Sequence, residues 1–159
     1  MKKLFLILAL TLICTGLKAH DLGQLKNETR LNVMIDYSDV LINGLTIEEF
    51  EQTENDWVKD APSIYSKFID AFNKKVKYLV GGKIKKSAYT LTVHPLVIKR
   101  NGDTEAYFTI SDVNGNEYYR SQEIKASGGT FGSQLNLMGD GMKSLGKKIG
   151  GEVKKLIKK

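Results

Sequence analysis

The sequence predicts an α+β fold, in which a mostly antiparallel sheet of about four strands carries two or three helices on one face. Three observations lead to this prediction. A segment that alternates with period two is followed by two segments of helical period. A run of β-branched, alternating segments then fills the middle of the chain. The last segment returns to helical period, and strands grouped between helices favour a two-layer arrangement.

Residues 1–19 are predicted to be a secretory signal peptide and to lie outside the fold. A basic start is followed by an apolar run over residues 4–13, which is too short to span a bilayer, and Ala19 ends the segment as a small residue. Cys14 would be the lipidation site of a lipoprotein, but Ile13 stands where such a signal carries a small residue. We therefore expect cleavage after Ala19 without lipidation.

Residues 20–159 are expected to form a single α+β domain with a basic C-terminal helix. No later apolar run reaches the roughly 18 residues of a membrane-spanning helix, so none is expected in the mature chain. Cys14 is the only cysteine, so the exported domain has no disulfide and depends on its core. We expect the protein in the periplasm or outside the cell, at most peripheral to the outer membrane.

The charge is unevenly distributed along the chain. The whole sequence holds 24 Lys and Arg against 18 Asp and Glu, a net charge of +6. Residues 143–159 contain seven lysines and one glutamate, whereas residues 20–142 carry a net charge of −3. A slightly acidic body with a basic end argues against nucleic-acid binding and restricts any attraction for anions to the C-terminal helix.

The first half of the domain is predicted to hold one strand and two helices. Thr46 and Glu49 have the spacing of a capping box, and Asp60 before Pro62 is typical of a helix start, where a missing N–H costs nothing. The predicted elements are a strand over 31–37, a turn at 43–44, a helix over 46–57, a second helix from 60 to about 75, and a loop or short edge strand over 74–86.

The second half is predicted to hold three strands and the terminal helix. Pro95 cannot donate to a ladder, so it indicates an edge strand or a bulge. Tyr89, Leu91 and Val93 are expected to point inward. The predicted elements are a strand over 88–100, a turn at 101–102, a strand around 106–110, a hairpin turn at 113–116, a strand over 117–124, and a helix over 133–159.

The terminal helix carries an apolar stripe and a row of lysines. We expect residues 133–150 to close the core, with Gly139, Gly146 and Gly150 allowing close approach to the sheet. Residues 151–159 are expected to reach outward. The predicted contacts to an anion or a membrane are Lys154, Lys155, Lys158 and Lys159.

Other candidate sites give weaker patterns, and we expect no cofactor, no metal and no catalytic set. His20, as a mature N-terminus, could form a copper brace with His94, but a strand histidine is more often an ordinary half-buried side chain. Asp112 begins a pattern similar to a calcium loop, but the loop glycine and the closing acid are missing, and a hairpin turn explains the pattern without a metal. The glycine-rich stretch 128–133 is expected to be a turn with Ser133 or Thr130 as N-cap.

Three stretches carry a resemblance to known proteins: MKKLFLILAL with LKAH, LNVMIDYSD, and GGTFGSQLNLMGDGMKSLGKKIG. With them the chain resembles small exported Bacteroidetes proteins of unknown function. The order of elements is similar to the α/β domains of envelope proteins related to curli assembly and to the TolB N-terminal domain. This resemblance implies an envelope location and no catalytic residues.

The sequence therefore predicts a non-enzymatic exported envelope protein that acts as an interaction module, with an envelope protein or an anionic surface as partner. The alternative is a protein that associates with a membrane or an anionic polymer through its lysine-rich helix. A remote alternative is a copper-brace oxidative enzyme using His20 and His94.

Overall fold

A computed structural model describes residues 22–158, so the predicted signal peptide, His20 and Lys159 lie outside the described residues. The described part starts with a short 3-10 helix, Leu22–Asn27, which is followed by two strands, two helices, five strands and a last helix. The elements are β1 (Arg30–Ile35), β2 (Leu41–Ile42), α1 (Ile47–Thr53), α2 (Trp57–Val76), β3 (Val80–Gly82), β4 (Tyr89–Ile98), β5 (Thr104–Asp112), β6 (Glu117–Arg120), β7 (Ile124–Ala126) and α3 (Gln134–Lys158).

The α+β class is confirmed, but the sheet has seven strands instead of about four. Its order is β3-β1-β4-β5-β6, with β2 also beside β4 and β7 also beside β5. The sheet is mixed: β5 pairs antiparallel with β4, β6 and β7, as predicted, but β1 runs parallel to both β3 and β4, and β2 runs parallel to β4. The cause is the crossover through α1 and α2, which returns the chain to β3 in the direction of β1.

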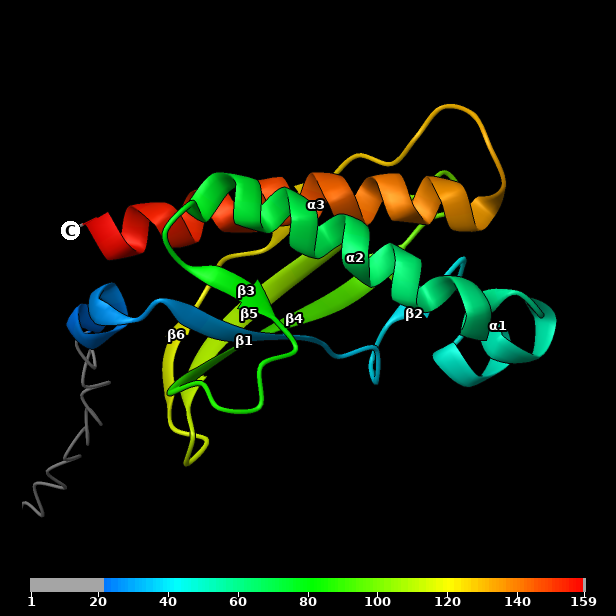
Figure 1. Cartoon of the computed structure of the whole chain (residues 1–159). Coiled ribbons are helices and arrows are strands. Elements are labelled where there is room, and N and C mark those ends of the chain that lie inside the picture. The colour runs from blue at the N-terminus through cyan, green and yellow to red at the C-terminus, as the bar shows by residue number, and fades with distance from the viewer. Residues whose placement is uncertain (1–21, 159) are drawn as a thin grey trace, which may run out of the picture.

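The helices α2 and α3 lie side by side over one face of the sheet (Figure 1). The strand side chains that face them alternate along each strand and are fully buried, as at Leu91, Val93, Ala106 and Phe108. The predicted inward set of β4 is therefore confirmed. The opposite face of the sheet carries half-buried polar side chains and no helix of the described chain covers it.

The two predicted helix boundaries near Trp57 are wrong. The first helix ends at Thr53, and the second begins at Trp57, so that Pro62 lies inside it. Trp57 fits the apolar pattern of the first helix in the sequence, although it belongs to the second. It packs edge-on against Phe50 across the break between the helices, with ring centroids 5.5 Å apart. The capping box is confirmed, since Thr46 accepts from the Glu49 N–H and the Glu49 side chain accepts from the Thr46 N–H.

Two irregularities shape the strands around β5. The sequence predicted either an edge strand or a bulge at Pro95, and the structure has a bulge there. The bulge lies in β4, which is a central strand. The predicted strand over 117–124 is interrupted at Ser121, whose hydroxyl accepts a hydrogen bond of 2.9 Å from the Phe108 N–H. The Ser121 N–H still donates to the Phe108 carbonyl, but the side-chain bond takes up the Phe108 N–H, and β6 and β7 are separated at this point.

The helix α3 packs along almost its whole length. Val153 and Ile157 are buried, so the prediction that residues 151–159 reach outward is wrong for this stripe. The predicted approach of glycines to the sheet is also corrected. Gly146 and Gly150 lie against the backbone of α2, and Gly141 is the glycine that meets the sheet, at the turn of Gly102.

Candidate anion-binding site on the helical layer

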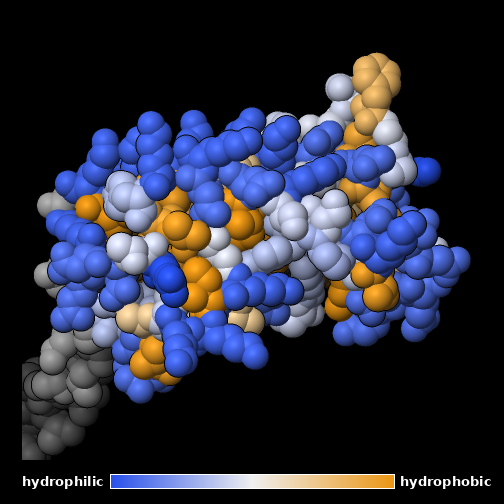
Figure 2. All heavy atoms as spheres, in the orientation of Figure 1, coloured by the Kyte–Doolittle hydropathy of each residue, from blue (hydrophilic) through white to orange (hydrophobic). Residues whose placement is uncertain are grey.

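Five lysines from two helices line a groove of about 540 Å³ between α2 and α3. We call it the lysine groove. Its cationic residues are Lys67, Lys74 and Lys75 on α2 and Lys143 and Lys147 on α3. Asp70 and Asp140 also line it, so the cations outnumber the carboxylates. Figure 2 shows hydrophilic side chains along the edge of the molecule that α2 and α3 form.

Glycines bring the two lysine rows together. A Cβ atom on Gly146 would collide with the carbonyl oxygen of Phe68, and one on Gly150 would lie 2.9 Å from the carbonyl oxygen of Phe72. A Cβ atom on Gly139 would lie 2.7 Å from Nζ of Lys67. The backbones of α2 and α3 are therefore in near contact, and their outer side chains share one surface.

The groove lysines have no carboxylate partners among the described residues. The ion pairs of residues 22–158 involve Asp36 with His94, Arg120 with Glu117, and Lys125 with Glu105 and Glu123. Because five lysines share the groove with only two carboxylates, the excess positive charges repel one another, and an anion bound between them would relieve that repulsion. The lysines near the ends of both helices also favour the helix dipoles, which is a structural reason for some of them.

The three predicted contact lysines that the structure describes divide between two sides of α3. Lys154 and Lys158 follow Lys147 by about two and three helical turns, so they continue the row of the lysine groove. Lys148 donates to the carbonyl of Lys125 at β7, so it faces away from the lysine groove. Lys155 follows Lys148 by about two helical turns and therefore lies on the same side as Lys148. Lys154 is half-buried, Lys155 and Lys158 are exposed, and Lys159 lies outside the described residues.

Sequence reasoning missed the contribution of α2 to this surface. Lys67 and Lys74 stand seven residues apart, which is about two helical turns, and this spacing was the available signal. The sequence does not show that α2 and α3 run side by side (Figure 1). Only that alignment places Lys67 and Lys74 beside the lysines of α3.

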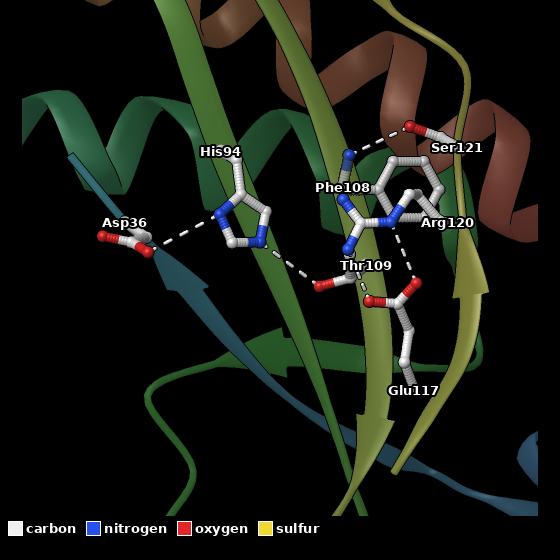
Figure 3. A network of polar contacts seen from close by, with 7 residues as sticks. All are labelled: Asp36, His94, Phe108, Thr109, Glu117, Arg120 and Ser121. Atoms are coloured by element: carbon white, nitrogen blue, oxygen red, sulfur yellow. Dashed lines mark hydrogen bonds and ion pairs between the residues drawn. The ribbon is translucent and has the colours of Figure 1, made fainter. Parts of the chain in front are cut away.

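A second polar cluster crosses the open face of the sheet (Figure 3). Nδ1 of His94 lies 3.5 Å from a carboxylate oxygen of Asp36, and its Nε2 lies 3.3 Å from Oγ1 of Thr109. The His94 ring stacks on Tyr107 with centroids 4.7 Å apart, and the Arg120 guanidinium lies 4.9 Å from the Tyr107 centroid. These side chains come from β4, β5, β6 and the end of β1.

Hydrogen bonds fix the charge state at both ends of this cluster. The Ser38 backbone N–H, followed by the Ser38 hydroxyl, lowers the pKa of Asp36, and His94 adds a smaller lowering effect. At the other end the Glu117 carboxylate raises the pKa of Arg120, to which it is bonded at 2.8 Å. Both groups are therefore ionised near neutral pH.

The order of acid, imidazole and hydroxyl in this cluster resembles that of a nucleophilic triad. Thr109 is only 8% exposed, so an acyl substrate cannot approach its hydroxyl. Both nitrogens of His94 face protein oxygens, which leaves neither directed at a metal. We interpret the cluster as a link that ties β1, β4 and β5 together on the face without helices.

The calcium-like loop is a hairpin turn. The carboxylate of Asp112 accepts from the backbone N–H groups of Asn114 and Asn116 and from the Asn116 side chain, and Gly115 has a φ of +82°. The Asn116 side chain lowers the pKa of Asp112 most, so the carboxylate is stabilised by its own loop. Within residues 22–158 no cluster of three His, Cys, Asp or Glu could hold a metal ion.

The glycine-rich entry to α3 is a turn, as predicted. The Gly128 N–H donates to the Asp103 carboxylate at 2.9 Å, and the Ser133 hydroxyl accepts from the Asn136 N–H at 3.4 Å. Ser133 is therefore the cap residue of α3. None of the helices in the described part of the chain combines the length and the apolar character needed to cross a membrane.

No protein-family profile and no curated protein matches this chain. Among solved structures it is similar to a PelC dodecamer from Paraburkholderia phytofirmans, at 14% identity and a TM-score of 0.42, over 82% of this chain and 86% of that chain. It is also similar to a DUF330 protein from Xanthomonas campestris, at 8% identity and a TM-score of 0.45, over 80% of this chain and 84% of that chain.

A third similar structure is a candidate lipoprotein from Caulobacter crescentus, at 10% identity and a TM-score of 0.40, over 77% of this chain and 92% of that chain. At these identities and TM-scores the likeness supports no conclusion about function. The resemblance to Bacteroidetes and curli-related proteins stays a prediction from the sequence.

Proposed function

We propose that this protein is a non-enzymatic binding protein of the cell envelope, which associates peripherally with an anionic membrane surface through the lysine groove. The observation that carries the proposal is the presence of five lysines from two helices in one groove, with no ion pair to a carboxylate among the described residues. The predicted signal peptide would bring this surface to the envelope.

The arrangement of the lysines favours a surface over a single small anion. Lys154 and Lys158 extend the row beyond the groove along the outer side of α3. A lysine near an anionic membrane contributes about 1 kcal/mol, so a row of several gives useful affinity. The apolar stripe of α3 is buried in the core and is not free to enter the lipid, so the contact is electrostatic.

A vesicle sedimentation experiment tests this proposal with the processed chain, purified after export. We expect it to pellet with vesicles of phosphatidylcholine and phosphatidylglycerol at low salt, and to leave them as the salt concentration approaches about 1 M, where charges are screened beyond about 3 Å. Equal pelleting with pure phosphatidylcholine would contradict the proposal. Pelleting with peptidoglycan but not with anionic vesicles would replace the membrane by an anionic polymer.

A further inference from the structure

A cleft of about 670 Å³ lies on the other side of α2, between this helix and the outer edge of β1. We call it the β1 cleft. Its walls are the second half of β1, the first half of α2, and Lys83 and Lys85, which follow β3. In the orientation of Figure 1, hydrophobic residues are exposed between the α2 edge and the loops beneath it (Figure 2).

The backbone of β1 presents an unpaired edge in this cleft. The Asp36 N–H donates to the Val93 carbonyl of β4, so in a parallel ladder the peptide groups of Ile35 point to the opposite side. On that side β3 ends at Gly82, which is opposite Asn32. The Val33 carbonyl is covered by the Tyr65 hydroxyl at 2.8 Å. Within residues 22–158, Ile35 is therefore the residue of β1 whose N–H and C=O remain open to a further strand.

Apolar and aromatic side chains surround this open edge. Trp57 packs edge-on against Tyr37, with ring centroids 5.5 Å apart, and its indole N–H donates to Glu51 at 3.0 Å. Met34 is 52% exposed and Val58 is 77% exposed, although both side chains line the cleft. Burial raises the pKa of the Tyr37 hydroxyl, which keeps it a neutral donor. Such walls can take the apolar side chains of a bound chain.

The cleft is basic at one end. Nζ of Lys83 lies 5.1 Å from the centroid of the Tyr65 ring, and the Ile84 N–H donates to Asn32, which fixes this connection beside the start of β1. Lys85 lines the same end. At the far end Glu51 is already bonded to Trp57. An occupant that carries negative charge is therefore attracted to the Lys83 end of the cleft.

We propose that the β1 cleft binds an extended segment of a partner protein, which adds to β1 as a strand at Ile35 and places acidic residues beside Lys83 and Lys85. The segment lies beside β1 in the strand position that β3 leaves empty after Gly82, and α2 forms the outer wall of this position. Main-chain hydrogen bonds to a strand edge supply affinity, and alternate side chains in the cleft supply selectivity. This site is separate from the lysine groove.

The probe is a displayed library of random peptides, selected against the processed chain and followed by a synthetic, terminally blocked peptide of the leading sequence. We expect selected peptides to alternate apolar residues and to carry Asp or Glu at one end. Trp57 is the only tryptophan, so its fluorescence reports binding in the cleft directly. Failure to select any peptide, or selection of basic peptides, would overturn the proposal.

Two variants separate strand addition from simple apolar binding. Ile35→Pro removes the outward N–H but none of the β1 N–H groups that bond β4, and we expect it to weaken the peptide about tenfold. Val58→Asp keeps the edge but puts a charge into the apolar wall beside Trp57, so it should weaken a peptide with apolar side chains there, and it serves if Ile35→Pro does not fold. Lys143→Gln with Lys147→Gln should leave the affinity unchanged.

Hydrogen exchange at Ile35 completes the test. A bound strand should slow exchange of the Ile35 amide in the wild-type chain, because that N–H would be hydrogen-bonded. Laurate is the contrasting probe, since an acyl chain fills the cleft without pairing with the backbone. Peptide binding that leaves Ile35 exchange unchanged, or that survives a folded Ile35→Pro variant, would overturn strand addition in favour of an amphiphile site.

Discussion

The processed chain with Lys67, Lys74, Lys143 and Lys147 all replaced by glutamine is expected to bind anionic vesicles several hundredfold more weakly, because each lysine contributes about 1 kcal/mol near an anionic surface. Glutamine and lysine have similar helix propensities, and these side chains are exposed or half-buried, so the fold should be unaffected within about 0.5 kcal/mol. Titration of vesicles at low salt measures the effect.

The matched control replaces four exposed lysines outside the groove, Lys26, Lys59, Lys86 and Lys99, with glutamine. The net charge changes by the same amount, but these residues are spread over other parts of the molecule. We expect a much smaller loss of vesicle affinity. Equal losses in the two variants would mean that overall charge, instead of the lysine groove, drives the association.

Alanine substitutions at two glycines of α3 should change stability in opposite directions. A Cβ atom on Gly146 would collide with the backbone of Phe68, which cannot move without separating α2 from α3. Such overpacking costs about 1–3 kcal/mol and exceeds the helix-propensity gain of about 1 kcal/mol. A Cβ atom on Gly151 would meet no atom within 4 Å, so Gly151→Ala should gain up to about 1 kcal/mol.

Urea denaturation of Gly146→Ala and Gly151→Ala, each compared with the wild type, measures the two free energies of unfolding. We expect a lower midpoint for the first and a higher midpoint for the second. If Gly146→Ala were as stable as Gly151→Ala, the close contact between α2 and α3 would not exist, and the lysine groove would lose its structural basis.

The sequence predicted those parts of the fold that local patterns determine. The apolar stripe of α3, the alternation around Leu91 and Phe108, and the capping box of Thr46 and Glu49 each depend on neighbouring residues. The short strands β2 and β7 were not predicted, because two or three residues carry no period. They exist because β4 and β5 offer edges to pair with.

Long-range contacts caused the wrong predictions. Trp57 matches the face of α1 because it meets Phe50 in space, although it begins α2. Gly146 and Gly150 were correctly taken as close-contact residues, but the partner surface is α2 instead of the sheet. The spacing of the glycines indicates that another element packs closely against α3, and the topology determines which element that is.

The sequence predicted only the part of the candidate site that α3 contributes. The lysines of α3 stood out as a local excess of charge, whereas Lys67 and Lys74 lie in a helix of four lysines and two aspartates, in which the excess is smaller. The sheet crossover sets the direction of α2 relative to α3, and that direction joins the two rows. The open edge at Ile35 is likewise a result of strand order and of the early end of β3.

Lysine acetylation, read by mass spectrometry with and without anionic vesicles, tests the binding surface most directly. We expect the vesicles to protect Lys67, Lys74, Lys143 and Lys147 together, while Lys26, Lys86 and Lys99 keep their reactivity. Protection confined to Lys155 and Lys158, or spread equally over all exposed lysines, would contradict a binding surface built from both α2 and α3.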